Sequence, residues 1–201
     1  MEFRHLSVEG AVEFGFPVFP DDRGCFASSL MESDFVRALG RRPFRPGQVS
    51  FTRSRKGVVR GVHYTATPPG CAKFVHCPAG RALDMVVDLR VGSPTWGRWD
   101  SVLIGPDSPK AVYLPVGVGH AVLALEEGTV ITYLLSEEYV PANELGVDVH
   151  DPELGLPLPE GSGLIRSARD ASAPTVAKAL EAGLLPTYED SIAGEKGLTE
   201  A

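Results

Sequence analysis

Eight short runs of apolar and β-branched residues follow one another between residues 48 and 139, with turns of Gly, Pro, Asp and Ser between them. Runs of this kind, bounded by turn residues, are typical of β-strands. Their close spacing predicts an all-β fold, either a closed barrel or a two-sheet jelly roll. No helical stretch separates the runs, which argues against a parallel α/β fold. The expected strands are residues 48–53, 58–64, 72–77, 82–90, 99–104, 110–114, 121–125 and 129–135.

The segments on either side of this region predict a few short peripheral elements. Residues 1–20 alternate weakly and indicate one or two strands. A helix is expected from a Ser33 cap to a Gly40 stop, by the rules for helix ends. A second helix is expected over residues 174–185, where apolar residues recur at helical spacing. We expect the last dozen residues to be frayed.

Composition excludes several classes of protein. The 201 residues suffice for one domain over 1–201, with its core at about 48–139 and a C-terminal loop and helix over 140–190. A net charge of −7 argues against a nucleic-acid partner. No apolar run approaches the roughly 20 residues of a membrane helix, and no secretory signal is recognisable. Three cysteines without a C-x-x-C pair indicate neither disulfides nor zinc. We therefore expect a cytoplasmic protein without a membrane partner.

The stretch from Gly57 to Lys73 combines charged and titratable side chains with valines. Arg60, His63 and Lys73 lie among β-branched and turn residues. Such groups cost desolvation free energy in a strand unless they have a partner or a function. An edge strand with a solvated polar face is the plain alternative, because antiparallel strands ordinarily alternate apolar and polar residues.

Two fragments have the spacing of cupin-type barrels, one from Gly57 to His63 and one from Pro115 to His120. Metal-binding cupins carry further ligands, but Thr65 stands where their second histidine would be and Ala124 where an asparagine would be. Two neutral imidazoles would leave a divalent metal under-coordinated. We therefore do not expect a bound metal ion.

Without a metal, an imidazole can serve as a base, because its pKa of roughly 6.5 suits proton transfer near neutral pH. A base that works on carbon needs a group to hold the resulting oxyanion, and often an acid on the opposite face. Lys73 could stabilise an enolate oxygen, and Tyr133 could deliver a proton. An ordinary strand aromatic remains the alternative for Tyr133.

A set of motifs runs through the chain, and their combination is far more specific than any one of them. They are Asp22-Arg23-Gly24-x-Phe26, Gln48-x-Ser50, the run from Lys56 to Tyr64, Ala72-Lys73-Phe74-Val75, the run from Leu83 to Gly97, Leu114-Pro115-x-Gly117-x-x-His120, Tyr133, Tyr139-x-Pro141-x-x-Glu144 and Arg169-Asp170. Over about residues 5–175 the sequence resembles the nucleotide-sugar epimerases typified by dTDP-4-dehydrorhamnose 3,5-epimerase, including relatives from deoxysugar pathways for antibiotics.

This resemblance implies a homodimer of cupin-like jelly rolls that acts on a dTDP-4-keto-6-deoxyhexose without a metal or organic cofactor. It implies that His63 is the general base and that Asp170 is its carboxylate partner. By the same resemblance Lys73 stabilises the C4 enolate and Tyr133 is the acid on the other face.

The resemblance also implies a substrate-binding set. Arg23 and Arg60 match pyrophosphate-binding arginines, a role that suits the guanidinium fork. His120, hydrogen-bonded to Asp84, is expected to line the same cavity. The remaining expected contacts are Gln48 and Ser50 for the sugar or nucleotide, Glu144 for the base end, and Phe26, Tyr139 and Arg169 from the matching motifs.

Three positions depart from the pattern of the family. Ser28 stands where many members have glutamate, Glu138 where many have an aromatic residue, and Ser50 where asparagine is common. These departures leave open whether C3, C5 or both are inverted. A non-catalytic cupin that binds a nucleotide sugar is the alternative function, and a metal-dependent cupin oxygenase or isomerase is a third.

Overall fold

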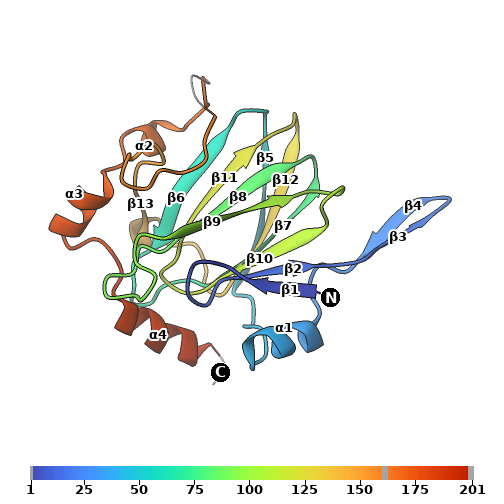
Figure 1. Ribbon diagram of the computed structural model, residues 1–201, viewed down its shortest axis with the longest axis horizontal. Coiled ribbons are helices and arrows are strands. Elements are labelled where there is room, and N and C mark those ends of the chain that lie inside the picture. The colour runs from blue at the N-terminus through green and yellow to red at the C-terminus, as the bar shows by residue number, and fades with distance from the viewer. Residues whose placement is uncertain (1, 160–162, 199–201) are drawn as a thin grey trace.

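Two antiparallel β-sheets pack face to face in the computed structural model, which describes residues 2–159 and 163–198 (Figure 1). The larger sheet consists, in spatial order, of β1 (Glu2–His5), β2 (Val12–Gly15), β10 (Lys110–Leu114), β7 (Lys73–Ala79), β12 (Thr129–Leu135) and β5 (Gln48–Ser54). The smaller sheet consists of β13 (Glu144–Gly146), β6 (Val59–Thr65), β11 (Gly119–Ala124), β8 (Ala82–Val87) and β9 (Trp99–Ile104). The predicted all-β class is confirmed.

The eight expected strands are all present in these sheets. Those at 99–104, 110–114 and 129–135 have the expected bounds, and four others shift by one or two residues. The exception is β8, which ends at Val87 because the chain then turns so that Asp88 and Arg90 can pair. The turns at Gly80-Arg81 and Glu126-Glu127-Gly128 suggest hairpins in the sequence, but this interpretation is wrong. The short connections there join β7 to β8 and β11 to β12, which belong to different sheets and do not pair with each other.

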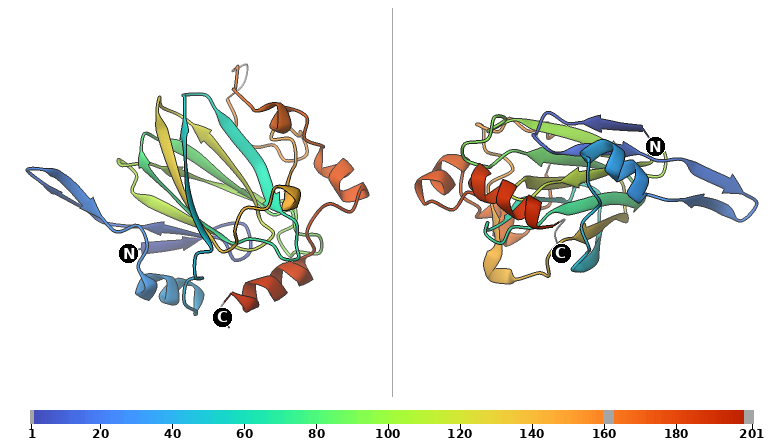
Figure 2. Two further views of the ribbon diagram at one scale, coloured as in Figure 1. Left: turned by 180° about the vertical axis from the view of Figure 1, so that it is seen from behind. Right: turned by 90° about the horizontal axis from the view of Figure 1, so that it is seen from below.

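Side-chain alternation along the strands produces three apolar layers. The inward residues of both sheets, such as Val75 and Val86, form the layer between the sheets. Outward residues of the five-stranded sheet, such as Met85, pack against the C-terminal segment. Outward residues of the six-stranded sheet, such as Phe74, pack against Phe35 of the first helix. Figure 2 shows the sheets and the helices around them from behind and from below.

The first helix, α1 (Glu32–Leu39), ends at Gly40 as predicted. Gly40 has a φ of 71° and donates its N–H to the carbonyl of Val36, a helix end that favours glycine. The predicted Ser33 cap is wrong, because the cap position is Met31 and Ser33 lies inside the first turn. Acidic residues in that turn favour the helix N-terminus without a side-chain cap.

The described residues of the C-terminal part, 140–159 and 163–198, contain three short α-helices rather than one. They are α2 (Ala168–Ala171), α3 (Val176–Glu181) and α4 (Tyr188–Gly197), and a 3₁₀ turn, η1 (Pro141–Asn143), precedes β13. The expected helix over 174–185 is therefore shorter, beginning after the Thr175 cap and ending before Gly183, whose φ is 63°. No helix of the described residues is long and apolar enough to cross a membrane.

The expectation of a frayed C-terminus is wrong for residues 190–198, and residues 199–201 lie outside the described part. Glu195 of α4 accepts hydrogen bonds from Arg41, from the Tyr113 hydroxyl and from the backbone N–H of Val116. These contacts come from distant parts of the chain, and α4 has no apolar periodicity of its own. They stabilise a helix that local sequence does not indicate.

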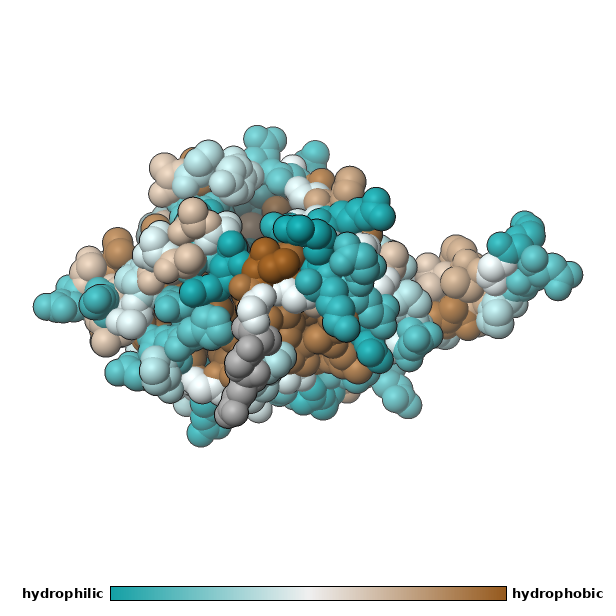
Figure 3. Space-filling view, turned by 90° about the horizontal axis from the view of Figure 1, so that it is seen from above, coloured by the Kyte–Doolittle hydropathy of each residue, from teal (hydrophilic) through white to brown (hydrophobic). Residues whose placement is uncertain are grey.

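The strands β3 (Val18–Asp21) and β4 (Gly24–Ala27) pair only with each other and form a hairpin that we call the arm. The arm extends away from the two sheets (Figure 1). Phe19 and Phe26 lie on it 56% and 65% exposed, with ring centroids 6.5 Å apart. In the space-filling view the arm carries apolar residues along its length and hydrophilic ones at its tip (Figure 3).

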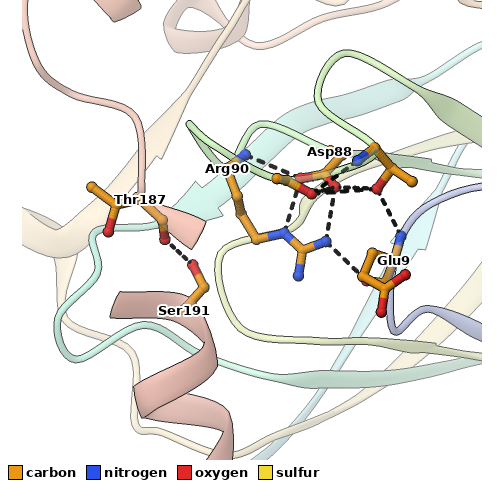
Figure 4. Close-up of polar contacts among 7 residues, drawn as sticks. Glu9, Asp88, Arg90, Thr187 and Ser191 are labelled. Atoms are coloured by element: carbon orange, nitrogen blue, oxygen red, sulfur yellow. Dashed lines mark hydrogen bonds and ion pairs between the residues drawn. The ribbon is translucent and has the colours of Figure 1, made fainter. Parts of the chain in front are cut away.

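A buried polar network joins the loop after β8 to both ends of the chain (Figure 4). Asp88 and Arg90 are 0% and 1% exposed, and their side chains form two hydrogen bonds, Nε to Oδ1 at 2.9 Å and Nη2 to Oδ2 at 2.8 Å. Arg90 also donates to the carbonyl of Glu9 and lies over the ring of Tyr188, at the start of α4. Burial alone would raise the pKa of Asp88, but its hydrogen bonds with Arg90, Ser93 and Thr95 hold that pKa below its usual value.

We predict that Asp88→Asn destabilises the fold by about 3 kcal/mol, because it leaves the buried Arg90 guanidinium without a carboxylate. Urea denaturation at a fixed protein concentration measures the free energy of unfolding. The matched control is Asp107→Asn at an exposed turn, which should change that free energy by no more than about 0.5 kcal/mol. Equal effects of the two variants would contradict the role of the pair.

Candidate active site

A cavity of about 290 Å³ opens at one end of the space between the sheets. Its walls are the inward residues of β5, β6, β7, β11 and β12 at the end where most of these are polar. The predicted catalytic residues His63, Lys73 and Tyr133 line it. The predicted binding residues that line it are Gln48, Ser50, Arg60, His120, Tyr139, Glu144 and Arg169.

His63 on β6 forms a hydrogen bond of 2.6 Å from Nε2 to Oδ1 of Asp170, 107 residues further along the chain. Asp170 is buried in α2, where the Ser167 side chain caps the helix. An ionised carboxylate only accepts hydrogen bonds, so it fixes the proton on Nε2 and leaves Nδ1 with a free lone pair.

The pKa of His63 is lowered from its ordinary value. Burial is the main cause, and the charges of Lys73 and Arg169 act in the same direction. The hydrogen bond and charge of Asp170 raise the pKa without cancelling the effect of burial. His63 is therefore a neutral imidazole at neutral pH and can accept a proton.

A second histidine–aspartate pair lies beside the first. His120 on β11 is directly opposite His63 on β6, so both rings project from the same face of the sheet. His120 Nε2 lies 2.7 Å from Oδ2 of Asp84, and both side chains are buried. Oδ1 of Asp84 has no hydrogen-bond partner among the described residues. The expected contact between His120 and Asp84 is thus present in the structure.

Tyr133 and Lys73 come from the opposite sheet. Tyr133 on β12 lies edge-on to the His120 ring, with centroids 6.1 Å apart. Burial raises the pKa of Tyr133 to about 12, so the phenol keeps its proton at neutral pH. Lys73 on β7 is 8% exposed and forms no ion pair within the described residues. A base and an acid therefore face the cavity from different sheets, with an ammonium group beside the acid.

Polar residues at the mouth of the cavity hold one another in place. Gln48 donates to Ser50 Oγ at 2.7 Å and accepts from the backbone N–H of Tyr139 at 2.8 Å. Arg169 donates to the backbone carbonyl of Glu144 at 2.9 Å. Within the described part of the chain, Arg60 donates to the hydroxyl of Ser54 and forms no ion pair. The two guanidinium groups keep their charge available for an anionic ligand.

The sequence profile of one protein family, described as dTDP-4-dehydrorhamnose 3,5-epimerase, matches residues 5–178. The chain belongs to this family. A dTDP-4-dehydrorhamnose 3,5-epimerase from Streptomyces griseus is 41% identical to it over 199 residues, which are 98% of this chain and 98% of the relative.

Two solved structures of epimerases are also similar to this chain. One is NovW, a 4-keto-6-deoxy sugar epimerase from the novobiocin biosynthetic gene cluster of Streptomyces spheroides, with 43% identity, a TM-score of 0.90 and 95% of both chains covered. The other is ChmJ, a 3'-monoepimerase from Streptomyces bikiniensis in complex with dTDP-quinovose, with 40% identity, a TM-score of 0.91 and 98% of both chains covered. The predicted resemblance and the cupin-like jelly-roll fold are confirmed.

Three residues of the predicted binding set do not line the cavity of their own chain: Asp84, which is fully buried beside His120, and Arg23 and Phe26. Arg23 and Phe26 lie on the arm, where Arg23 pairs with Asp21 at 2.5 Å. Both are exposed, with 89% of the Arg23 side chain accessible to solvent. Neither residue faces the cavity of its own chain in this structure.

The prediction from sequence also missed residues that line the cavity. Thr52, Thr65, Cys71 and Glu137 are among them. The alternation Gln48-x-Ser50-x-Thr52 on β5 was a signal for Thr52, because residues two apart share a face of a strand. Among the described residues, no group of three or more His, Cys, Asp or Glu could hold a metal ion.

We predict that the His63 imidazole titrates below its ordinary pKa of about 6.5, as NMR of labelled protein can measure. Asp170→Asn should lower that pKa further, because it removes the group that raises it. Lys73→Met should raise it, because it removes a positive charge. The His63→Asn spectrum assigns the resonance. A pKa above the ordinary value, or shifts of the same sign in both variants, would disprove this electrostatic description.

Proposed function

We propose that this chain epimerises a dTDP-4-keto-6-deoxyhexose at C3, C5 or both, through a C4 enolate and without a metal or organic cofactor. The observation that carries the proposal is the placement of the two proton-transfer groups. His63 projects from the five-stranded sheet and Tyr133 from the six-stranded sheet. Inversion at carbon requires removal of a proton from one face and delivery to the other, and this arrangement suits it.

The chemistry follows from the ketone at C4, which acidifies the hydrogens at C3 and C5. Nδ1 of His63 takes one of these protons, and the electron pair of the broken C–H bond moves to the C4 oxygen. Asp170 stabilises the imidazolium that forms, and Lys73 stabilises the enolate oxygen. Tyr133 then delivers its proton to the opposite face and becomes a phenolate. Proton exchange with solvent returns both groups to their starting state.

Basic residues at the mouth suit the diphosphate of the nucleotide sugar. Arg60 and Arg169 keep free charge there, and a guanidinium fork pairs well with phosphate oxygens. The ChmJ structure holds dTDP-quinovose, which supports a dTDP-sugar as the ligand of this related chain. A non-catalytic nucleotide-sugar binder is not favoured, because all four groups of the expected catalytic set are retained.

The test is incubation with dTDP-4-keto-6-deoxyglucose in deuterated water, followed by NMR of C3 and C5. We expect solvent deuterium at one or both carbons, and the labelled carbon identifies the centre that is inverted. His63→Asn and Tyr133→Phe should each lower turnover by about 100-fold or more, the usual scale of general acid–base catalysis. Both variants should still bind dTDP, as calorimetry can show. Absence of label at both carbons with the unmodified protein would rule out this function.

We propose further that the protein is a homodimer in which each arm completes the cavity of the other protomer. The arm exposes two phenylalanines, and exposed apolar patches of this kind mark interaction surfaces. β5 is an edge strand whose inward residues form a cavity wall, while its outward residues Val49 and Phe51 are 64% and 73% exposed. A partner that covers this outward face would lie next to the cavity, within reach of Arg23 on its arm.

Mixing two inactive variants tests the exchange of arms. Arg23→Ala damages the arm and His63→Asn damages the cavity, so a mixed dimer contains one intact pair of arm and cavity. After unfolding and refolding together, the mixture should recover roughly a quarter of wild-type activity, since half of the dimers are mixed and each has one working site of two. The control mixture of His63→Asn with Tyr133→Phe should recover none, because both changes lie in the cavity. No recovery in the first mixture would refute the exchange.

The compartment is proposed on chemical grounds. The three cysteines, Cys25, Cys71 and Cys77, are unpaired. Free thiols suit a reducing environment. This observation supports the cytoplasm as the place of action.

A further inference from the structure

Thr52 is a cavity residue that the chemistry above does not use. It is the third inward residue of β5, after Gln48 and Ser50. Those two form a hydrogen bond with each other at 2.7 Å. The hydroxyl oxygen of Thr52, in contrast, is buried and has no hydrogen-bond partner among the described residues.

The strand register places Thr52 beside Tyr133. On the neighbouring strand β12, Tyr133 lies opposite Ser50 and Ile131 lies opposite Thr52. Thr52 is therefore the diagonal neighbour of Tyr133 on the same face of the sheet, within reach of a long aromatic side chain. The Thr52 hydroxyl is placed to hydrogen-bond with Tyr133, an interaction that lowers the pKa of Tyr133, although the structure shows no formed hydrogen bond between them and burial acts more strongly in the opposite direction.

A buried hydroxyl without a partner is unfavourable, because it has lost its hydrogen bonds to water. This cost is removed if a hydrogen-bond acceptor for the hydroxyl appears during the reaction. When Tyr133 gives up its proton it becomes a phenolate, whose oxygen accepts hydrogen bonds strongly. Thr52 is the neighbouring group with an unused O–H.

We propose that Thr52 is a positioning residue that acts through Tyr133: its hydroxyl donates a hydrogen bond to the phenolate that forms when Tyr133 delivers its proton. This inference rests on the proposed epimerase function. It assigns Thr52 to the second half of the reaction only, the protonation of the enolate. Proton removal by His63, from the other sheet, does not involve Thr52.

The experiment compares proton exchange with inversion in deuterated water, using dTDP-4-keto-6-deoxyglucose. Thr52→Val keeps the shape of the side chain and removes the hydroxyl. We expect His63 to continue introducing deuterium into recovered substrate at close to the wild-type rate. Formation of the inverted sugar should fall by about tenfold or more, the scale of a hydrogen bond to a charged group, while KM stays unchanged. Thr52→Ser, which restores the hydroxyl, should recover the wild-type ratio of inversion to exchange.

Thr132→Val is the matched control. Thr132 lies next to Tyr133 on β12 but does not line the cavity, and its cross-strand partner is the exposed Phe51. The Thr132→Val variant should keep the wild-type ratio of inversion to exchange. If recovered substrate carries no deuterium in any variant, the solvent isotope effect on kcat is measured in place of the ratio of inversion to exchange. This isotope effect should be larger in Thr52→Val than in the wild type and should return to the wild-type value in Thr52→Ser.

Several outcomes would overturn the inference. The inference is wrong if Thr52→Val keeps the wild-type ratio of inversion to exchange, or if it loses exchange and inversion equally. It is also wrong if Thr132→Val changes this ratio as much as Thr52→Val does. If Thr52→Val does not fold, Thr52→Ala is subject to the same comparison. Failure of the proposed function has a different signature, because the unmodified protein would then incorporate no deuterium into substrate or product.

Discussion

The hydrogen bond between His63 and Asp170 is the contact on which the rest of the site depends. It joins β6 of the five-stranded sheet to a short helix 107 residues further along the chain. α2 has four residues and cannot be stable alone. Its position depends on the apolar packing of the C-terminal segment against the outward face of the five-stranded sheet. The layer that covers the outside of that sheet thus orients the base inside it.

Alternation along antiparallel strands explains why the cavity has the residues it has. The same inward positions carry valine or isoleucine in the core and polar groups at the open end. On β7 these are Val75 in the core and Lys73 in the cavity, and on β12 they are Ile131 and Tyr133. Polar groups placed this close to a dry core need partners, and each cavity histidine has a buried carboxylate. Burial gives His63 and Tyr133 their opposite protonation states, because it lowers the pKa of the imidazole against the opposing effect of Asp170 and raises the pKa of the phenol.

Much of the fold could be predicted because strands leave a local signal in sequence. Strand bounds and the Gly40 helix end depend on residues near one another in the chain. The order of helix α4 could not be predicted from nearby residues, because Arg41 and Tyr113 from distant segments hold Glu195 in place. The pairing of His63 with Asp170 was expected from family resemblance alone, because spacing in sequence says nothing about it. Arg23 was placed in the site for the same reason, whereas its location on a protruding arm could not be foreseen from composition.

The edge strand β5 has a consequence for how such enzymes can diversify. Its even-numbered positions, Gln48, Ser50 and Thr52, face the cavity, while Val49 and Phe51 between them face outward. Because neighbouring residues on a strand point to opposite sides, a change at one set leaves the geometry of the other set intact. Substrate range and surface contacts can therefore evolve separately within seven consecutive residues. A shift of register by one residue would exchange the two sets, so insertions and deletions in β5 are the changes this arrangement cannot accommodate.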